Sequence, residues 1–268
     1  MRLFPALIAA TACLSALAAE PEWKPLFDGK STEGWIQRGG KAKYTVEDGC
    51  IVGTSVAGTP NSFLCPPDDY ANFVLEYEYK VDPELNSGVQ FRSLSLPEYH
   101  NGQVHGYQCE IDNDPKKARF WAAGIYEEGA RGWLCPMKDD KEAGKAFTEQ
   151  GAKITKVADW NKVRIEARGS DIKTFFNGEP RATLKDDKTA RGFIGFQVHG
   201  IGNDKSHEGK QVRWRNLRIR SPGRRAGGTS SGFAFAPASR GVGVSARAQA
   251  QATPTGRHLR PRKPITFP

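Results

Sequence analysis

The chain has 268 residues, of which 38% are hydrophobic and 26% charged. This composition excludes a collagen-like or wholly disordered chain and supplies enough apolar residues for a core. The net charge of +9 lies at the ends: residues 221–268 carry eight bases and no acid, whereas 20–220 balance 30 bases against 30 acids. A neutral body argues against nucleic acid as a partner. No apolar run is long enough to span a membrane in the mature chain.

Residues 1–18 have the pattern of a secretory signal peptide. A positive start at Arg2 precedes the apolar stretch 3–17, and Ala16-Leu17-Ala18 matches a small-x-small cleavage site. The alternatives are an N-terminal core helix or a lipoprotein signal at Cys13, but the latter lacks the usual leucine three residues earlier. We therefore expect a secreted or periplasmic protein.

Residues 19–220 are predicted to form one domain of short β-strands. Apolar and polar residues alternate over 73–80 and 160–168, as in half-buried antiparallel strands, and Asn177-Gly178 is a strong hairpin signal. Further strands are expected at 44–54, 61–65, 87–93, 106–112, 172–176, 192–199 and 211–219, and only 140–150 has a helical character. Many short strands separated by turn residues indicate an all-β sandwich.

Four cysteines remain after removal of a signal peptide, and an oxidising compartment would permit bridges between them. Cys50 and Cys65 flank the turn-rich stretch 56–60, and a hairpin there would place them opposite each other. A Cys50–Cys65 disulfide is therefore expected, with two buried free thiols as an open alternative to a second bridge between Cys109 and Cys135. No C-x-x-C spacing occurs, so the sequence predicts no zinc site.

Residues 221–268 are rich in Arg, Ala, Gly, Ser and Pro and show no periodicity. Such a segment buries too little surface to offset its ordering entropy. We interpret it as a disordered, basic, low-complexity tail. It serves either as an arm for an acidic partner or as an extension without a role.

Three predicted strands carry planar, multidentate polar groups on one face. Because side chains alternate along a strand, each strand presents its polar residues together. A sugar offers vicinal hydroxyls that donate and accept, which such groups bind well. The residues concerned are Gln90 and Arg92, Gln108, Glu110 and Asp112, and Gln197 and His199.

This face also carries residues suited to catalysis. Glu110 and Asp112 lie two residues apart, roughly 7 Å between Cβ atoms, which suits a pair of carboxylates flanking a water in glycoside hydrolysis. His199 is a candidate general base near neutral pH. The plainer interpretation is a solvated face with an Arg92–Glu110 ion pair and a structural histidine. A divalent cation at Asp112-Asn113-Asp114 is another option, although the helix–loop–helix calcium pattern is absent.

A series of short motifs resembles the 3-keto-disaccharide hydrolase family. It begins at Leu26-Phe27-Asp28-Gly29-Lys30, passes through Asn86–Arg92, Gly106–Asp112 and Gly124-Ile125-Tyr126, and ends at Phe196–Gly200 and Arg215-Asn216-Leu217. The order of the motifs is more specific than any one of them. The resemblance implies an exported bacterial protein with a concanavalin A-like jelly roll, and it adds Asn86 and Tyr126 to the substrate-binding candidates. The tail has no counterpart in the family, and the cysteines depart from its pattern.

The resemblance also implies a substrate whose C3 hydroxyl is already a ketone. That ketone acidifies the C2 hydrogen, so a base, His199 or Glu110, could remove the proton. The C1 substituent would then leave, and water would add. Arg92 and Gln108 would stabilise the enolate oxygen in this scheme, or a divalent cation would do so.

Two other functions fit the sequence. A non-catalytic carbohydrate-binding module is the main alternative to a glycosidase-type hydrolase, because jelly rolls host both. Trp121, Tyr126 and Trp133 could supply the aromatic platform of such a module. The third function is a structural surface protein with an adhesive tail.

Overall fold

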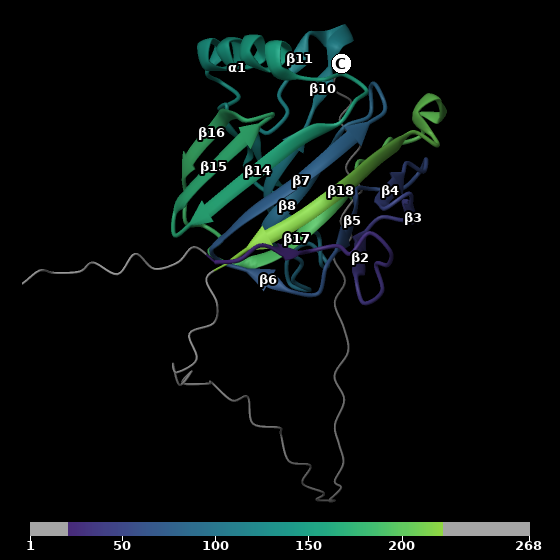
Figure 1. The fold of residues 1–268 in the computed structure, drawn as a ribbon. Helices are drawn as coiled ribbons and strands as arrows, with labels where there is room; N and C mark the ends of the chain where they lie inside the picture. The colour runs from purple at the N-terminus through teal and green to yellow at the C-terminus, as the bar shows by residue number, and fades with distance from the viewer. Residues whose placement is uncertain (1–20, 222–268) are drawn as a thin grey trace, which may run out of the picture. The chain divides into compact units, whose positions relative to one another are not determined.

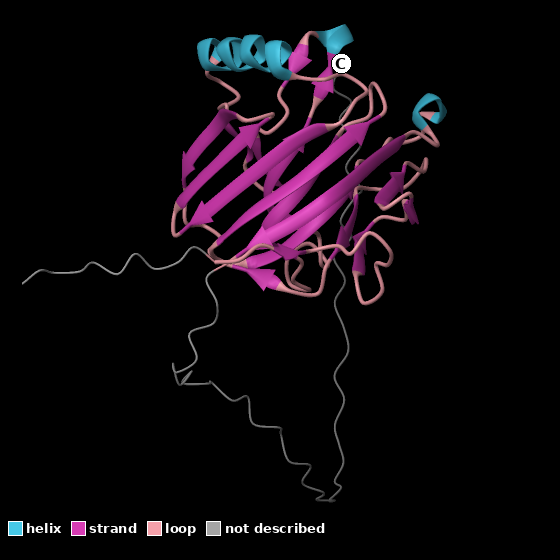
Figure 2. Cartoon of the chain, in the orientation of Figure 1, coloured by secondary structure: helices cyan, strands magenta, loops and turns pink. Residues whose placement is uncertain are grey.

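The computed structural model describes residues 21–221, which form two large antiparallel sheets packed face to face (Figure 1). Strands dominate the chain (Figure 2), which confirms the predicted all-β sandwich. The predicted signal peptide at 1–18 lies outside the described residues, as does the predicted tail beyond Ser221. Across the part of the chain that is described, none of the helices has the length and apolar character to cross a bilayer.

The first sheet, here sheet A, has eight strands with β7 and β18 near its centre. Its order is β16 (Glu179–Lys185), β15 (Asp171–Phe176), β14 (Asn161–Arg168), β7 (Phe73–Val81), β18 (Gln211–Arg220), β4 (Cys50–Thr54) and β3 (Lys43–Glu47), and β1 (Lys24–Pro25) also pairs with β18.

The second sheet, sheet B, also has eight strands. Its order is β13 (Gly132–Cys135), β12 (Ile125–Glu128), β9 (His105–Ile111), β8 (Ser87–Leu94), β17 (Gly192–Val198), β5 (Ser62–Cys65) and β2 (Ile36–Gly39), and β6 (Asp69–Tyr70) also pairs with β17.

The core fills the space between the sheets. Inward residues of both sheets are almost completely buried, and aromatic rings make edge contacts across the core, such as Phe196 with Tyr77 and with Trp214. Alternation of apolar and polar residues along β14 and β7 therefore reflects one buried and one less buried face, as expected for a sandwich.

Two turns illustrate how the sequence sets the strand boundaries. Asn177-Gly178 joins β15 to β16 with φ values of 51° and 94°, the left-handed pair that a two-residue hairpin requires. Asp48-Gly49 does the same between β3 and β4, with φ values of 50° and 73°. The single strand expected at 44–54 is thus a hairpin of two.

The smaller elements other than the 3-10 turn at 205–207 lie together at one end of the sheets (Figure 1). Helix α1 (Lys141–Ile154) confirms the expected helical segment, and its N-cap Asp140 accepts a hydrogen bond from the Ala143 amide. The remaining elements are the two-stranded ribbon β10 (Asn113–Asp114) and β11 (Arg119–Phe120) and the 3-10 turns at Pro115–Lys117 and Lys205–His207.

The expected Cys50–Cys65 disulfide is wrong for this structure, in which both cysteines are free thiols. Cys50 lies on β4, which pairs with β3 and β18 in sheet A, whereas Cys65 lies on β5, which pairs with β2 and β17 in sheet B. The stretch between them crosses from one sheet to the other and closes no hairpin. Cys109 and Cys135 are also free.

Candidate functional site

Polar side chains gather on the face of sheet B that points away from the core. The inward residues of β8, β9 and β17 include Val89, Cys109 and Phe196, which belong to the core cluster. The alternate residues therefore share the outer face. In the register of the sheet, Gln197 lies opposite Gly88 and Gly88 opposite Glu110.

Four of these side chains form a directed hydrogen-bond chain. The Ser93 hydroxyl donates to Gln90 Oε1 at 2.6 Å, Gln90 Nε2 donates to Gln108 Oε1 at 2.6 Å, and Gln108 Nε2 donates to Glu110 Oε1. All four residues are buried. These hydrogen bonds fix the orientation of both glutamine amides, so the Gln108 amide donates an N–H to one oxygen of the Glu110 carboxyl group.

Glycine at position 88 makes this arrangement possible. A Cβ atom there would lie 2.5 Å from Cδ of Gln108, whose side chain lies across the glycine. The absence of a side chain on the central strand lets Gln108 reach Glu110 and leaves room between Glu110 and Gln197.

Glu110 is 4% exposed, and burial raises its pKa to about 8. The hydrogen bond from Gln108 opposes this shift, and the nearby carboxylates of Asp112 and Glu128 reinforce it. Because the pKa lies above neutral pH, Glu110 holds a proton there and is a hydrogen-bond or proton donor.

His199 follows the last residue of β17 and is half-buried. Its Nδ1 lies 2.8 Å from the Gly200 carbonyl oxygen, which can only accept, so Nδ1 carries the hydrogen and the Nε2 lone pair remains. Burial lowers the pKa of His199 below 6.5, against the opposing effects of the Gly200 carbonyl and of Asp112. At neutral pH the imidazole is therefore uncharged, with a basic Nε2.

Asp112 lies near His199 and Glu110, since its charge affects the pKa of both. Its carboxylate forms an ion pair of 2.5 Å with Nη2 of Arg119. This contact stabilises the charged form of Asp112. Asp112 therefore contributes negative charge near Glu110 and His199 and holds the Arg119 side chain by an ion pair.

Glu128 is a further carboxyl group of the site, one that was absent from the residues selected by sequence. It ends β12, and its Oε1 accepts a hydrogen bond of 2.9 Å from Asn61 Nδ2. Asn61 Oδ1 in turn accepts from the amide of Gly200 at 2.8 Å. Burial raises the pKa of Glu128. Its spacing of two residues from Tyr126 was the signal that could have revealed it.

The Asn61–Glu128 hydrogen bond shows that the outer face of sheet B is concave. Asn61 directly precedes β5, and four strand steps separate β5 from β12. Neighbouring strands lie about 4.8 Å apart, so a flat sheet would separate the two side chains by about 19 Å. The sheet must therefore curve strongly around Glu110 and His199.

Gln197 and Asn86 complete the concave face. Gln197 is fully buried, and within residues 21–221 neither atom of its amide group has a hydrogen-bond partner. Buried amides normally have one, so the hydrogen-bonding capacity of this amide is unused among the described residues. Asn86 is half-buried beside Glu110 and lowers the pKa of that carboxyl group.

Arg92 is not part of this site, contrary to the sequence prediction. Its φ of 47° and a register shift between Phe91 and Leu94 interrupt the alternation of β8. The guanidinium donates to the carbonyls of Ala71 and Gly169, both at 2.7 Å. Ala71 and Gly169 border strands of sheet A, so Arg92 ties the two sheets together.

Aromatic side chains adjoin the site on the β12–β13 side. Tyr126 lies opposite Gln108 in the register, and its ring meets Trp133 edge to face at 5.5 Å. Trp133 also meets Trp121 edge to face at 4.6 Å. Trp133 thus joins the three rings proposed from sequence as a platform, because it contacts each of the other two.

Within residues 21–221, no group of three or more His, Cys, Asp or Glu side chains is arranged to hold a metal ion. The suggested divalent cation stays a prediction.

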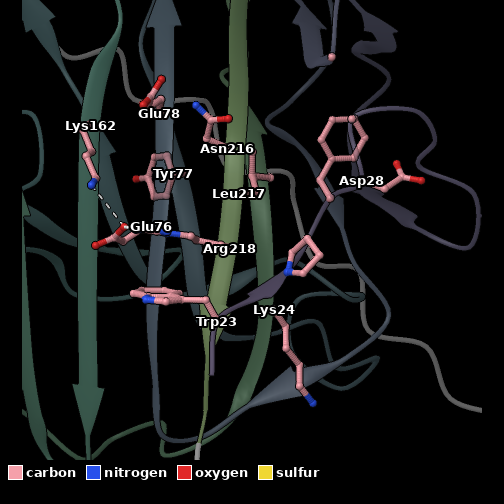
Figure 3. Close-up of a pocket in the computed structure, with 14 residues that line it drawn as sticks. Trp23, Lys24, Asp28, Glu76, Tyr77, Glu78, Lys162, Asn216, Leu217 and Arg218 are labelled. Atoms are coloured by element: carbon pink, nitrogen blue, oxygen red, sulfur yellow. Dashed lines mark hydrogen bonds and ion pairs between the residues drawn. The ribbon is translucent and has the colours of Figure 1, made fainter. Parts of the chain in front are cut away.

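A separate hollow of about 610 Å³ lies on sheet A, lined by Trp23, Glu76 and Lys162 among others (Figure 3). Glu76 is ion-paired there with Arg218 at 2.6 Å and Lys162 at 3.4 Å, and the Trp23 ring lies beside Arg218. These ion pairs hold the pKa of Glu76 below its ordinary value. A carboxylate held in this way is a poor acid or base, so we place the candidate chemistry on sheet B.

Comparison with known families identifies one match. Residues 22–220 match the family described as the 3-keto-alpha-glucoside-1,2-lyase-like domain. No curated protein matches the chain.

One solved structure supports the fold, and two others are similar to the chain at lower TM-scores. A Bacillus subtilis protein of unknown function with a galectin-like fold aligns with a TM-score of 0.52 and 13% identity over 76% of this chain and 96% of that one. A candidate glycosyl hydrolase from Parabacteroides distasonis ATCC 8503 is 20% identical over 74% of this chain and 93% of that one, with a TM-score of 0.48. Carbohydrate binding module CBM66 from Bacillus subtilis is 16% identical over 70% and 96%, with a TM-score of 0.46.

Proposed function

We propose that this chain, which belongs to the 3-keto-alpha-glucoside-1,2-lyase-like family, cleaves the glycosidic bond of 3-keto-glycosides. Family membership points to carbohydrate chemistry on a β-sandwich. The proposal adds the reaction: removal of the C2 proton, loss of the C1 substituent, and addition of water to the resulting double bond. The net result is hydrolysis. On this proposal the enzyme acts after export, as the expected signal peptide at 1–18 suggests.

The substrate's own ketone explains why elimination is feasible here. A carbonyl at C3 acidifies the adjacent C2–H, because the electron pair left by the proton is delocalised onto O3 as an enolate. Collapse of the enolate forms the C1–C2 double bond and expels the C1 oxygen with its substituent. The protein therefore needs a base at C2, hydrogen-bond donors at O3 and a proton for the leaving oxygen.

His199 is the base in this proposal. Its Nδ1 hydrogen is held by the Gly200 carbonyl, so the free lone pair is on Nε2. The lowered pKa keeps the imidazole neutral at physiological pH and ready to accept the C2 proton. The charge of Asp112 then stabilises the imidazolium that forms.

Glu110 is the acid. With a pKa of about 8 it holds a proton at neutral pH, and the Gln108 amide fixes the orientation of its carboxyl group. It protonates the departing C1 oxygen. Asn86, beside Glu110, donates to the enolate oxygen in place of the originally expected Arg92.

A single observation carries the proposal: one concave face holds a neutral histidine and a protonated carboxyl group whose pKa values lie on either side of neutral pH. Environments that separate two pKa values in this way define an acid–base pair. An ordinary solvated strand face does not hold a carboxyl group at 4% exposure.

Deuterium exchange tests the mechanism. The full chain is incubated in D₂O with a 3-keto-glucoside, and the sugar is recovered at partial conversion. The proposal predicts deuterium at C2 of the 3-keto-glucose product and a primary kinetic isotope effect with a C2-deuterated substrate. Product without C2 deuterium and without an isotope effect would show direct displacement at C1 instead.

A carbohydrate-binding module is the second candidate, favoured by the contact among Trp121, Tyr126 and Trp133. Aromatic rings at the edge of a polar face bind sugars without any chemistry. This function predicts saturable binding of glycosides, oxidised or not, with no turnover. Calorimetry together with product analysis on the same samples separates the two functions.

A further inference from the structure

We infer that the aromatic wall formed by Trp121, Tyr126 and Trp133 is a subsite for the leaving group, selecting glycosides whose C1 substituent is itself a ring. The inference rests on the proposed function, since it names the substrate class of that site. The shared chemistry of the ligand is a flat, largely apolar ring face, which either an aryl group or a second sugar provides.

Trp133 lies against the backbone next to Glu110. The backbone amide of Glu110 donates to the carbonyl of Gly124 at 3.0 Å. A Cβ atom on Gly124 would lie 3.0 Å from Cζ3 of Trp133. The indole thus lies directly against the backbone that neighbours Glu110, on the side of Glu110 away from His199 and strand β17.

The wall is also rigid. Trp121 Nε1 donates to Thr148 Oγ1 of α1 at 2.8 Å. A Cβ atom on Gly144 of the same helix would contact the Trp121 ring at 3.4 Å. Trp121 and Tyr126 then meet Trp133 edge to face from two directions. A ring held in this way loses little entropy when it binds a ligand.

The wall is also joined electrostatically to the acids. The guanidinium of Arg119 lies 5.0 Å from the Trp121 ring centre and 5.4 Å from that of Trp133, and it pairs with Asp112. The Arg119 side chain remains 42% exposed. A ligand on the wall would therefore meet a partly exposed guanidinium beside an aromatic surface, a combination suited to a ring that carries oxygen atoms.

The three rings of the wall are half-buried. Because Glu110 is the proton donor to the leaving oxygen in our mechanism, the group attached to that oxygen must pass beside Glu110. The wall provides the aromatic surface on that side.

The test compares leaving groups in the full-length protein. Wild type and Trp133→Ala are assayed with three 3-keto-glucosides that carry a methyl group, a nitrophenyl group or a second glucose at C1. We expect Trp133→Ala to lower kcat/KM about tenfold for one or both ring-bearing substrates, chiefly through KM. The methyl glucoside should be unaffected. The larger of the two ring effects identifies an aryl or a sugar leaving group.

Trp160→Ala is the matched control, because Trp160 stacks under Arg215 at 3.8 Å beside sheet A and is also half-buried. It should change none of the three rates. If Trp133→Ala fails to fold, Trp133→Leu replaces it and should give the same selective loss. Equal losses for all three substrates, or no loss with the ring-bearing pair, would overturn the inference.

A binding experiment separates this inference from the proposed function. Unoxidised nitrophenyl glucoside is titrated into wild type and Trp133→Ala while tryptophan fluorescence is recorded. Binding that is lost with Trp133 supports the subsite even if no 3-keto-glucoside is turned over, in which case only the proposed reaction fails. Equal binding by both proteins removes the subsite whatever the turnover.

Discussion

Asn61 and Glu128 are joined by a hydrogen bond of 2.9 Å although they come from opposite sides of sheet B. Asn61 also accepts from the amide of Gly200, the residue whose carbonyl fixes the His199 ring. The orientation of His199 and the position of Glu128 therefore depend on one amide side chain. We propose that Asn61 positions the base without touching the substrate.

Replacement of Asn61 by alanine should weaken both stability and turnover. Loss of partners for the Gly200 amide and the Glu128 carboxyl group should cost about 1–3 kcal/mol of unfolding free energy. Turnover of a 3-keto-glucoside should fall about tenfold, because the Gly200 backbone loses its anchor. Thermal unfolding and initial rates measure the two effects.

Two further variants sharpen that prediction. Asn61→Asp retains the acceptor for Gly200 but faces Glu128 with a second carboxyl group, so its turnover should fall more at pH 8 than at pH 6. Asn203 is an exposed asparagine in the loop after β17. Asn203→Ala therefore serves as the control and should behave as wild type. Unchanged rates with Asn61→Ala would remove the positioning role.

Glu110 should make the stability of the protein depend on pH. The pKa of its carboxyl group is about 8 in the folded protein and about 4.5 when unfolded. Between these values the unfolded chain has released a proton that the folded chain retains, so stability falls as pH rises from about 4.5 to about 8. Glu110→Gln removes this effect and should gain stability over wild type with rising pH, by on the order of 4 kcal/mol at pH 8.

Chemical denaturation of both proteins at pH 5, 6.5 and 8 measures the difference. A stability gap that stays constant across this range would mean that Glu110 is ionised in the fold, and its assignment as the acid would then be wrong. Glu149→Gln, on the exposed side of α1, is the control and should show no comparable trend.

Removal of His199 should abolish most of the activity. A positioned base contributes about 10²–10⁴-fold, so His199→Ala should lose at least about 100-fold in kcat, with partial rescue by added imidazole. The neutral ring is the active form, and its pKa is below 6.5, so the wild-type rate should decline only below that pH. On the alkaline side the rate should decline near pH 8, as Glu110 loses its proton.

His105→Ala provides the comparison, because His105 stacks on Tyr99 at 3.8 Å at the opposite end of β9 from Asp112. It should retain the wild-type rate and pH profile. If His199→Ala kept the full rate, another group would have to remove the C2 proton.

Most of the fold was predictable because alternation along a strand reports directly on burial. The pattern at 160–168 and the Asn177-Gly178 turn identified a half-buried strand and a hairpin without tertiary information. The pairing of strands was not predictable in the same way. Cys50 and Cys65 were expected to face each other across one hairpin, but the chain between them changes sheets.

The sequence predicted the site residues whose positions follow from alternation along a strand. It did not predict positions that depend on the curvature of the sheet or on a β-bulge. Gln108, Glu110 and His199 lie on the face that alternation assigned to them. Arg92 does not, because a bulge redirects its side chain. The spacing from Tyr126 could have placed Glu128 on this face, but its contact with Asn61 arises from the bending of the whole sheet, which no local pattern encodes.

Arg92 should behave as a structural residue. Arg92→Met removes two hydrogen bonds between a buried guanidinium and the carbonyls of Ala71 and Gly169. It should lower the unfolding free energy by about 2–4 kcal/mol. The folded fraction should keep the wild-type KM within about twofold, because the guanidinium is engaged by the carbonyls of Ala71 and Gly169. Arg191→Met, which loses one exposed bond to the Asp69 carbonyl, should cost under about 1 kcal/mol. A large rise in KM with little loss of stability would return Arg92 to the substrate site.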